Sequence, residues 1–173
     1  MKSSQRKAHF VEELKKHYQG IISGARGAEL SAAEAADAIH EDATQREDAK
    51  AATASARMSS AHRKRRERAA REAEELVRFA SRGLRAFPRD AKVELGALVD
   101  VRIEADGDEE ERTLFFLPVG AGTELNGPGG DGFVSVVTPA SEIGRTLLGS
   151  QPGDAFDVEL GGTLREWTVL ELC

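Results

Sequence analysis

Four carboxylates lie within eight residues in the N-terminal half of the chain and could do chemistry there. They are Glu41, Asp42, Glu47 and Asp48. Carboxylate oxygens are hard ligands of the kind that Mg²⁺ prefers, and one or two can be enough because the ion keeps several waters. Taken alone, however, such a cluster is more typical of a solvated acidic helix turn, so the residues need a context before they predict a site.

A basic run from His62 to Arg68 is the other charged feature. At its centre lie Arg63, Lys64, Arg65 and Arg66. Consecutive residues of a helix point in different directions, so this run predicts a belt around a helix and not a stripe along it. Two interpretations stay open: a solvated belt balanced by the glutamates that follow, or a surface that contacts RNA phosphates or an acidic channel wall.

The overall composition excludes several classes of protein. The net charge of −6 argues against attraction of the whole chain to nucleic acid or anionic lipid. No apolar run approaches the ~20 residues that a bilayer span needs, and the N-terminus MKSSQRKAHF lacks the apolar core of a signal peptide. The one cysteine, Cys173, allows neither a disulfide framework nor a cysteine zinc site. The four histidines read as surface residues, and we expect a cytoplasmic protein.

The charged features belong to a half of the chain that differs in composition from the other half. Residues 1–87 contain no proline, whereas residues 88–173 contain all five prolines and the only tryptophan. Pro88 lacks a backbone donor and disfavours helix in the residue before it, so the joint is expected at Phe87-Pro88. The sequence therefore predicts two domains, 1–87 and 88–173.

Apolar residues of the first half recur at steps of three and four, which is the spacing of one helical face. The first stripe consists of Phe10, Leu14, Tyr18, Ile21 and Ala25. The second consists of Ala69, Ala73, Leu76, Ala80, Leu84 and Phe87. Two amphipathic helices joined by a short connection form an antiparallel hairpin. We therefore predict a helical hairpin, or antiparallel coiled coil, over residues 1–87.

Three glycines, Gly20, Gly24 and Gly27, weaken the first predicted helix. Each costs about 1 kcal/mol in a helix interior relative to alanine. A capping box that begins at Ser31 could start a new helix. A break near residues 24–30 therefore stays open, as does a layout in which a short first helix packs on a very long second one.

The second half alternates apolar and polar residues with a period of two, as half-buried strands do. The candidate strands are 93–103, 114–117, 133–137, 156–160 and 164–172. Asp106-Gly107 and Gly161-Gly162 supply turns, and Ser141 could cap a short helix that Gly149 ends. We predict an α+β protein in which the hairpin precedes a twisted antiparallel β domain with one short helix.

The segment 134–149, VSVVTPASEIGRTLLG, resembles the C-terminal signature of the GreA/GreB transcript cleavage factors. That signature runs roughly V-S-x-x-S-P-x-G-R-A-L-L-G. The likeness continues through Gly153-Asp154, a Gly-Gly turn and a last strand with Trp167, so it covers about 40 residues in the same order. Glu142 departs from it, because the family usually has proline there.

The resemblance implies a fold as well as a family. Gre-like proteins carry an N-terminal antiparallel coiled coil ahead of an FKBP-like domain, which agrees with the two halves described above. A fold of this kind does not imply prolyl isomerase activity. We expect the aromatic residues of the second half to form core and not an isomerase pocket. They are Phe115, Phe116, Phe133, Phe156 and Trp167.

The resemblance also implies a role for the acidic residues. In the family, the hairpin tip enters the secondary channel of a backtracked RNA polymerase, where its carboxylates help to hold a second Mg²⁺ and a water beside the polymerase's own metal. Asp42 falls on the family's Asp and is the expected principal acid, with Glu41 as a second Mg²⁺ ligand. Glu47 and Asp48 are the other candidate catalytic acids. Gln45 stands where the family has its second acid, which would weaken metal capture.

Partners follow from the same resemblance. The C-terminal domain is expected to anchor at the rim of the channel near the short helix, through Ser141, Ile143, Gly144 and Arg145. The family's coiled coil carries a basic patch that faces the transcript, which favours RNA contact for residues 63–66. The expected partners are bacterial RNA polymerase and the nascent RNA 3′ end, and the chain itself is expected to be a monomer. The expected Mg²⁺ is shared with the polymerase and is not stably bound by the chain alone.

The function implied by the resemblance is that of a transcription elongation factor, which is not itself an enzyme but stimulates the intrinsic RNA cleavage activity of RNA polymerase. Two alternatives remain. The same fold could block the channel and inhibit or retune transcription without cleavage, since its tip is altered. The chain could also be a coiled-coil adaptor or chaperone that never contacts polymerase.

Overall fold

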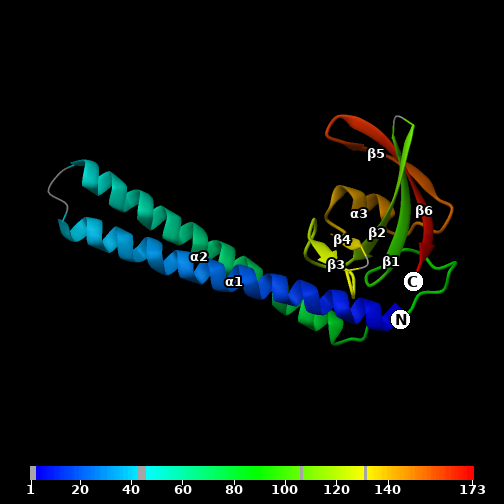
Figure 1. The fold of residues 1–173 in the computed structure, drawn as a ribbon, viewed down its shortest axis with the longest axis horizontal. Coiled ribbons are helices and arrows are strands. Elements are labelled where there is room, and N and C mark those ends of the chain that lie inside the picture. Colours follow the sequence, from blue (N-terminus) through cyan, green and yellow to red (C-terminus); the bar gives the residue numbers. More distant parts are fainter. Residues whose placement is uncertain (1–2, 43–45, 106, 131) are drawn as a thin grey trace. The chain divides into compact units, whose positions relative to one another are not determined.

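The computed structural model describes residues 3–42, 46–105, 107–130 and 132–173 (Figure 1). For residues 39–42, 46–49 and Leu160 it describes the backbone alone. The chain forms two compact units: one combines Met1–Leu14 with Glu75–Cys173, and the other is Lys15–Glu74. We call them the β-rich unit and the hairpin unit. The joint predicted at residues 87–88 lies within the β-rich unit, and a boundary between independently folding domains there stays a prediction.

The hairpin unit consists of the main parts of two long helices. Helix α1 spans Ser3–Asp42 and helix α2 spans Arg46–Ala80, and the two run antiparallel within the unit (Figure 1). The buried apolar side chains described in this unit are Tyr18, Ala25, Ala52 and Ala69. The predicted helical hairpin is confirmed, and its seam is rich in alanine, whose small side chain lets two helix backbones approach closely.

Helix α1 is continuous, so the break near residues 24–30 does not occur. Ser31 lies inside the helix and begins no new one. The cost of the three glycines is outweighed because Tyr18 and Ala25, on the opposite stripe, are buried, and most helical stability in proteins comes from such packing. A Cβ atom added at Gly20, Gly24 or Gly27 would meet no atom within 4 Å, so none of these glycines serves a close approach.

The predicted second stripe extends too far, because α2 ends at Ala80 and not beyond Leu84. Gly83 has φ +89° and its backbone N–H donates to the carbonyl of Ala80 at 3.0 Å. A glycine in this left-handed conformation is a common way to end a helix. Phe87 lies past the helix, yet it is buried in the core of the β-rich unit.

The β-rich unit contains a six-stranded sheet and the short helix α3 (Glu142–Leu147). The strands are β1 (Leu98–Ala105), β2 (Asp108–Phe116), β3 (Glu124–Asn126), β4 (Phe133–Val137), β5 (Ala155–Leu160) and β6 (Thr163–Leu172). Their order is β3-β4-β2-β1-β6-β5, and β2 pairs with β4 in parallel while the other pairs are antiparallel. The predicted class, a helical hairpin followed by a β domain with one short helix, is confirmed, and the sheet is mixed and not wholly antiparallel.

Two local features of the sheet differ from the sequence prediction. The strand predicted over 93–103 begins only at Leu98, because Gly96 has φ +93° and turns the chain; a Cβ there would lie 3.3 Å from the ring of Phe79. Strand β3 was not predicted, since three residues are too few to show a period of two. The turn predicted at Asp106-Gly107 falls between β1 and β2, although Asp106 itself lies outside the described residues.

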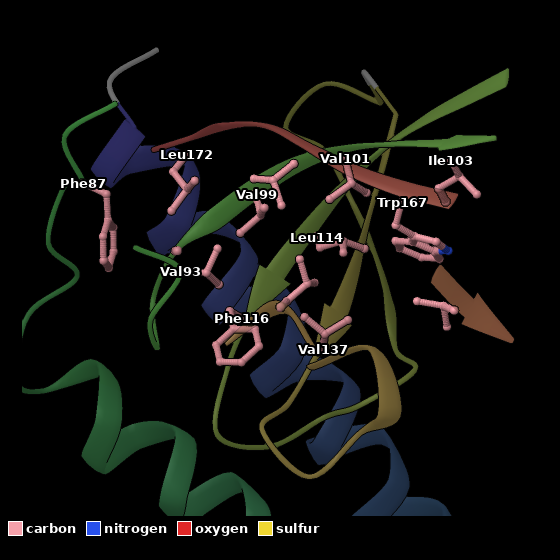
Figure 2. Close-up of a cluster of buried hydrophobic side chains, with 14 residues drawn as sticks. Phe87, Val93, Val99, Val101, Ile103, Leu114, Phe116, Val137, Trp167 and Leu172 are labelled. Atoms are coloured by element: carbon pink, nitrogen blue, oxygen red, sulfur yellow. The ribbon is translucent and has the colours of Figure 1, made fainter. Parts of the chain in front are cut away.

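A buried apolar cluster holds α3 against the sheet (Figure 2). It includes Leu114 and Phe116 of β2, Trp167 of β6 and Leu147 of α3. Phe115 alternates with these residues along β2, and its ring centroid lies 6.1 Å from that of Phe10 in α1. The first turns of α1 therefore pack on the sheet through Phe115.

The prediction that the aromatic residues form core is wrong for one of them. Phe115, Phe116 and Trp167 are buried and Phe156 is partly buried, whereas Phe133 at the start of β4 is 68% exposed.

Over the described part of the chain, no helix is long and apolar enough to span a membrane.

Candidate functional site at the hairpin apex

The four predicted acids lie on both sides of one helix–helix connection. Glu41 and Asp42 form the end of α1, and Glu47 and Asp48 lie in the first turn of α2. The fold thus places these positions together at the apex of the hairpin, as the prediction required. Their side chains, and Gln45 as a whole, lie outside the described residues, so the directions of the carboxylates stay open.

Helix electrostatics separates the two acidic pairs. A carboxylate in the first turn of a helix is favoured by the partial positive charge there, whereas one in the last turn is disfavoured, each by about 0.3–1 kcal/mol. Glu47 and Asp48 are therefore explained by the stability of α2 alone. Glu41 and Asp42 lie in the last turn of α1, where the helix dipole disfavours a negative charge. The stability of α1 therefore does not explain why acids occupy these positions.

The described side chains contain no group of three or more His, Cys, Asp or Glu that could hold a metal ion. The apex carboxylates are not among those side chains. As a donor set, one or two carboxylates suit Mg²⁺ only when other ligands complete its shell, because the ion demands near-octahedral coordination. Residues Glu41 and Asp42 fit a shared Mg²⁺ by chemistry, and a Mg²⁺ site at the apex remains a prediction.

The basic belt on α2 is split by one acid of α1. Glu29 receives hydrogen bonds from Arg63 Nε on Oε1 and from Arg66 Nε on Oε2, both at 3.0 Å. Its backbone carbonyl also accepts from Ser59 Oγ at 3.2 Å. Desolvation raises the pKa of Glu29, but the hydrogen bonds from Arg63 and Arg66 outweigh it and hold the pKa below its ordinary value.

The split divides the four predicted RNA-contact residues into two pairs. Arg63 and Arg66 are engaged across the hairpin by Glu29, which leaves them less free to bind phosphate. Lys64 and Arg65 are exposed. The sequence suggested an even belt, and only the register between α1 and α2 reveals which members face the partner helix.

The loop before α3 is built around Ser141 and Gly144. Ser141 Oγ donates to the carbonyl of Thr138 at 2.8 Å and accepts from the Gly144 N–H at 3.1 Å, so it caps α3 as predicted. A Cβ at Gly144 would lie only 1.9 Å from the carbonyl oxygen of Thr138. Ser141 and Gly144, two of the four residues predicted to contact a partner, thus have roles inside the protein: they hold the backbone of the loop that leads into α3.

The exposed residues around α3 differ from the predicted set. Ile143 packs against the apolar core, whereas Arg145 is exposed and its Nη1 donates to the carbonyl of Ala140 at 3.2 Å. Leu148, which the sequence analysis missed, is 51% exposed. A signal for it existed, because Leu147 and Leu148 are adjacent at the end of a helix and only one of them can face the core.

No family model and no curated protein sequence matches the chain. Solved structures of GreA/GreB-type factors align with it. A prokaryotic transcription elongation factor GreA/GreB from Nitrosomonas europaea shares 22% identity over 50% of this chain and 63% of its own, with a TM-score of 0.35. The chain therefore spans less than two thirds of that structure.

Other alignments extend over most of the chain, and two of them are with Thermus proteins. GreA factor homolog 1 of Thermus thermophilus shares 18% identity over 92% of this chain and 94% of its own, with a TM-score of 0.36. Gfh1 of Thermus aquaticus shares 15% identity over 91% and 92%, with a TM-score of 0.33. Since TM-scores below 0.5 do not establish a common fold, the function has to be inferred from the chain's own residues.

Proposed function

We propose that this chain is an elongation factor that binds in the secondary channel of RNA polymerase and stimulates cleavage of backtracked transcripts. The observation that carries the proposal is the position of Glu41 and Asp42. They stand at the end of α1, against the helix dipole, in a chain whose segment 134–149 resembles the GreA/GreB signature. Acids that cost helix stability are expected where they serve chemistry.

The proposed chemistry is a two-metal hydrolysis carried out by the polymerase. One ion activates a water while the other stabilises the leaving oxygen of the phosphodiester. In this scheme the Asp42 carboxylate, with Glu41 beside it, orients the water or the second Mg²⁺ when that ion is bound. The chain supplies only acid groups and their position, so it is not expected to cleave RNA without the polymerase.

Docking is proposed to use the exposed residues around α3. Arg145 and Leu148 offer a guanidinium next to an apolar side chain, and Ser141 and Gly144 fix the loop that precedes them. Arginine beside an apolar contact is a combination that is enriched in protein interfaces. The partner in this proposal is the channel rim of bacterial RNA polymerase.

A transcript cleavage assay on stalled elongation complexes tests the proposal. Addition of the chain should release short RNA fragments from the 3′ end, and Asp42→Ala should reduce that rate by at least tenfold, or about 1.4 kcal/mol. Asp37→Ala is the matched control, because Asp37 is an exposed acid of the same helix. Equal cleavage by the Asp42 and Asp37 variants would remove the apex from the mechanism.

A second candidate is a polymerase inhibitor of the same fold, and Gln45 is the feature that favours it. A neutral amide stands where the family has its second acid, so the apex could occupy the channel without recruiting metal. This candidate predicts that the chain slows RNA synthesis in the same assay while releasing no 3′ fragments. Gln45→Glu should then convert an inhibitor into a cleavage factor.

A further inference from the structure

Helix α2 carries a basic residue at every seventh position. The positions are Lys50, Arg57, Lys64 and Arg71, and Arg78 continues the series. The first four lie in the hairpin unit, and all of them are exposed. Seven residues are nearly two full turns, so these side chains form a line along the helix with about 10.5 Å between neighbours. We call these four residues the basic row.

The first three members of the basic row lie in a stretch of α2 without acids, whereas Glu67, Glu74 and Glu75 lie one helical turn from the fourth, Arg71. From Ala49 to Arg66 the sequence contains six basic residues and no Asp or Glu. Other basic residues of α2 have partners, since Glu29 engages Arg63 and Arg66, and Arg68 Nε lies 2.8 Å from Glu72 Oε1. Within the described part of the chain, no ion pair is formed by a residue of the row.

The regular spacing favours one class of ligand over another. A helix with a carboxylate at every seventh position presents charges at the same interval of about 10.5 Å, so it can pair with the row residue by residue, as charged flanking positions do in coiled coils. The phosphates of a duplex follow a strand that turns once in about 10.5 base pairs, so a straight row soon leaves the strand. The regular spacing of the basic row therefore favours a partner helix with carboxylates at the same spacing, which an irregular excess of positive charge would not do.

We propose that the basic row is a docking surface for an acidic α-helix of a protein partner, with carboxylates at heptad spacing. Lys64 is the one row residue that was also predicted to contact RNA, and neither the apex acids nor the residues around α3 take part. The inference therefore stands apart from the proposed cleavage function, and a chain without cleavage activity would still show this binding.

A binding experiment with designed probes tests the proposal. The first probe is a labelled four-heptad coiled coil with glutamate at one exposed position of every heptad, and the second has the same composition with those glutamates at irregular positions. The full chain is titrated into each probe at low and at physiological salt. The row variant replaces Lys50, Arg57, Lys64 and Arg71 by Gln; the control variant replaces Arg65, Arg82, Arg89 and Lys92, which are also exposed, by Gln.

The regular probe is expected to bind at least about tenfold more tightly than the irregular one, because four aligned pairs each add a small increment. The row variant should lose this preference and the control variant should keep it, while both retain the helical circular dichroism of the parent. Equal binding of the two probes would overturn the proposal. An RNA duplex that binds as tightly as the regular probe and competes with it would also overturn it, in favour of a phosphate-binding surface.

Discussion

In the hairpin unit, three of the four buried apolar side chains that the structure describes are alanines. The buried side chains of the β-rich unit are larger and include Phe115, Phe116, Leu147 and Trp167. The hairpin is ordered by packing along a narrow seam, so most of its surface is free to carry charge. The β-rich unit gains its order from close packing, so few of its positions tolerate a change. The difference predicts that substitutions on the hairpin surface change stability little, whereas substitutions in the β-rich core change it strongly.

Replacing glycine by alanine should have opposite effects on the stability of the two units, and the largest expected loss of stability is at Gly144 in the β-rich unit. A Gly144→Ala side chain would place Cβ 1.9 Å from the carbonyl oxygen of Thr138, which is backbone and cannot move aside cheaply. We expect a loss of at least about 3 kcal/mol in the free energy of unfolding of the β-rich unit. Trp167, the only tryptophan, is buried in that unit and reports its unfolding by fluorescence in urea.

Gly149→Ala is the matched control for this prediction. Gly149 has φ +84°, but a Cβ there meets nothing within 4 Å, so only conformational strain of about 1 kcal/mol is expected. Similar losses for the two variants would mean that the contact between α3 and Thr138 is looser than the structure indicates.

The second largest effect concerns a charge inside the β-rich unit. The Lys7 side chain is wholly buried; Nζ donates to the carbonyl of Arg85 at 2.8 Å and lies 4.6 Å from the ring centroid of Phe87. Burial lowers the pKa of Lys7 from 10.5 to about 8. The unfolded chain therefore holds this proton more tightly, and between pH 8 and 10.5 the free energy of unfolding should rise by up to about 3 kcal/mol.

Lys7→Met isolates this contribution, since methionine is apolar and of similar length. Because only the parent gains stability as Lys7 loses its proton, the stability of the variant relative to the parent should fall as the pH rises from 8 to 10.5. Trp167 fluorescence again reports unfolding. Lys92→Met, at an exposed position, should show no such change. A parent and Lys7 variant with parallel pH profiles would contradict the assigned pKa.

The third prediction uses the same substitution as the first and has the opposite sign. Gly24 lies in the middle of α1 on the exposed side, and an added Cβ would meet nothing within 4 Å. Gly24→Ala should therefore stabilise the hairpin unit by about 0.5–1 kcal/mol. The measurement is thermal unfolding followed by circular dichroism at 222 nm, and a destabilised variant would show that the glycine face contacts something.

The smallest effect is expected for the ion pairs across the hairpin. Glu29→Gln removes the carboxylate that engages Arg63 and Arg66, both of which are substantially exposed to solvent. Because the pKa of Glu29 is lowered in the folded state, its contribution is present above the ordinary glutamate pKa and is lost as the pH falls through the folded value. The variant should thus melt slightly below the parent at pH 7, and the difference should shrink as the pH falls below 4.5. Glu34→Gln, a substitution of an exposed acid of the same helix, should match the parent at pH 7.

Local patterns predicted most of the elements. The stripe through Phe10, Leu14 and Tyr18 predicted α1, and the Ser141 cap predicted α3, because both depend on residues close in sequence. The parallel pairing of β2 with β4 could not be predicted, since it joins strands separated by β3 and leaves no periodic signal. The end of α2 was misjudged because the apolar stripe continued past the Gly83 stop signal.

The candidate site divides in the same way. The hydrophobic pattern predicted the two helices, and the resemblance to Gre-like proteins predicted that Asp42 lies at their connection. The engagement of Arg63 and Arg66 by Glu29 depends on the register between α1 and α2, and the exposure of Leu148 depends on how α3 sits on the sheet. Long-range packing of this kind is not encoded in local spacing.

A photo-crosslinking residue in place of Glu41 tests the central claim most directly. In a backtracked elongation complex, we predict crosslinks from this position to the 3′ end of the RNA or to the polymerase active centre, and none to either from the same residue at Glu159 of strand β5. If the chain binds polymerase and the Glu41 position crosslinks to neither, the apex acids do not act at the site of cleavage, and the account given for them is wrong.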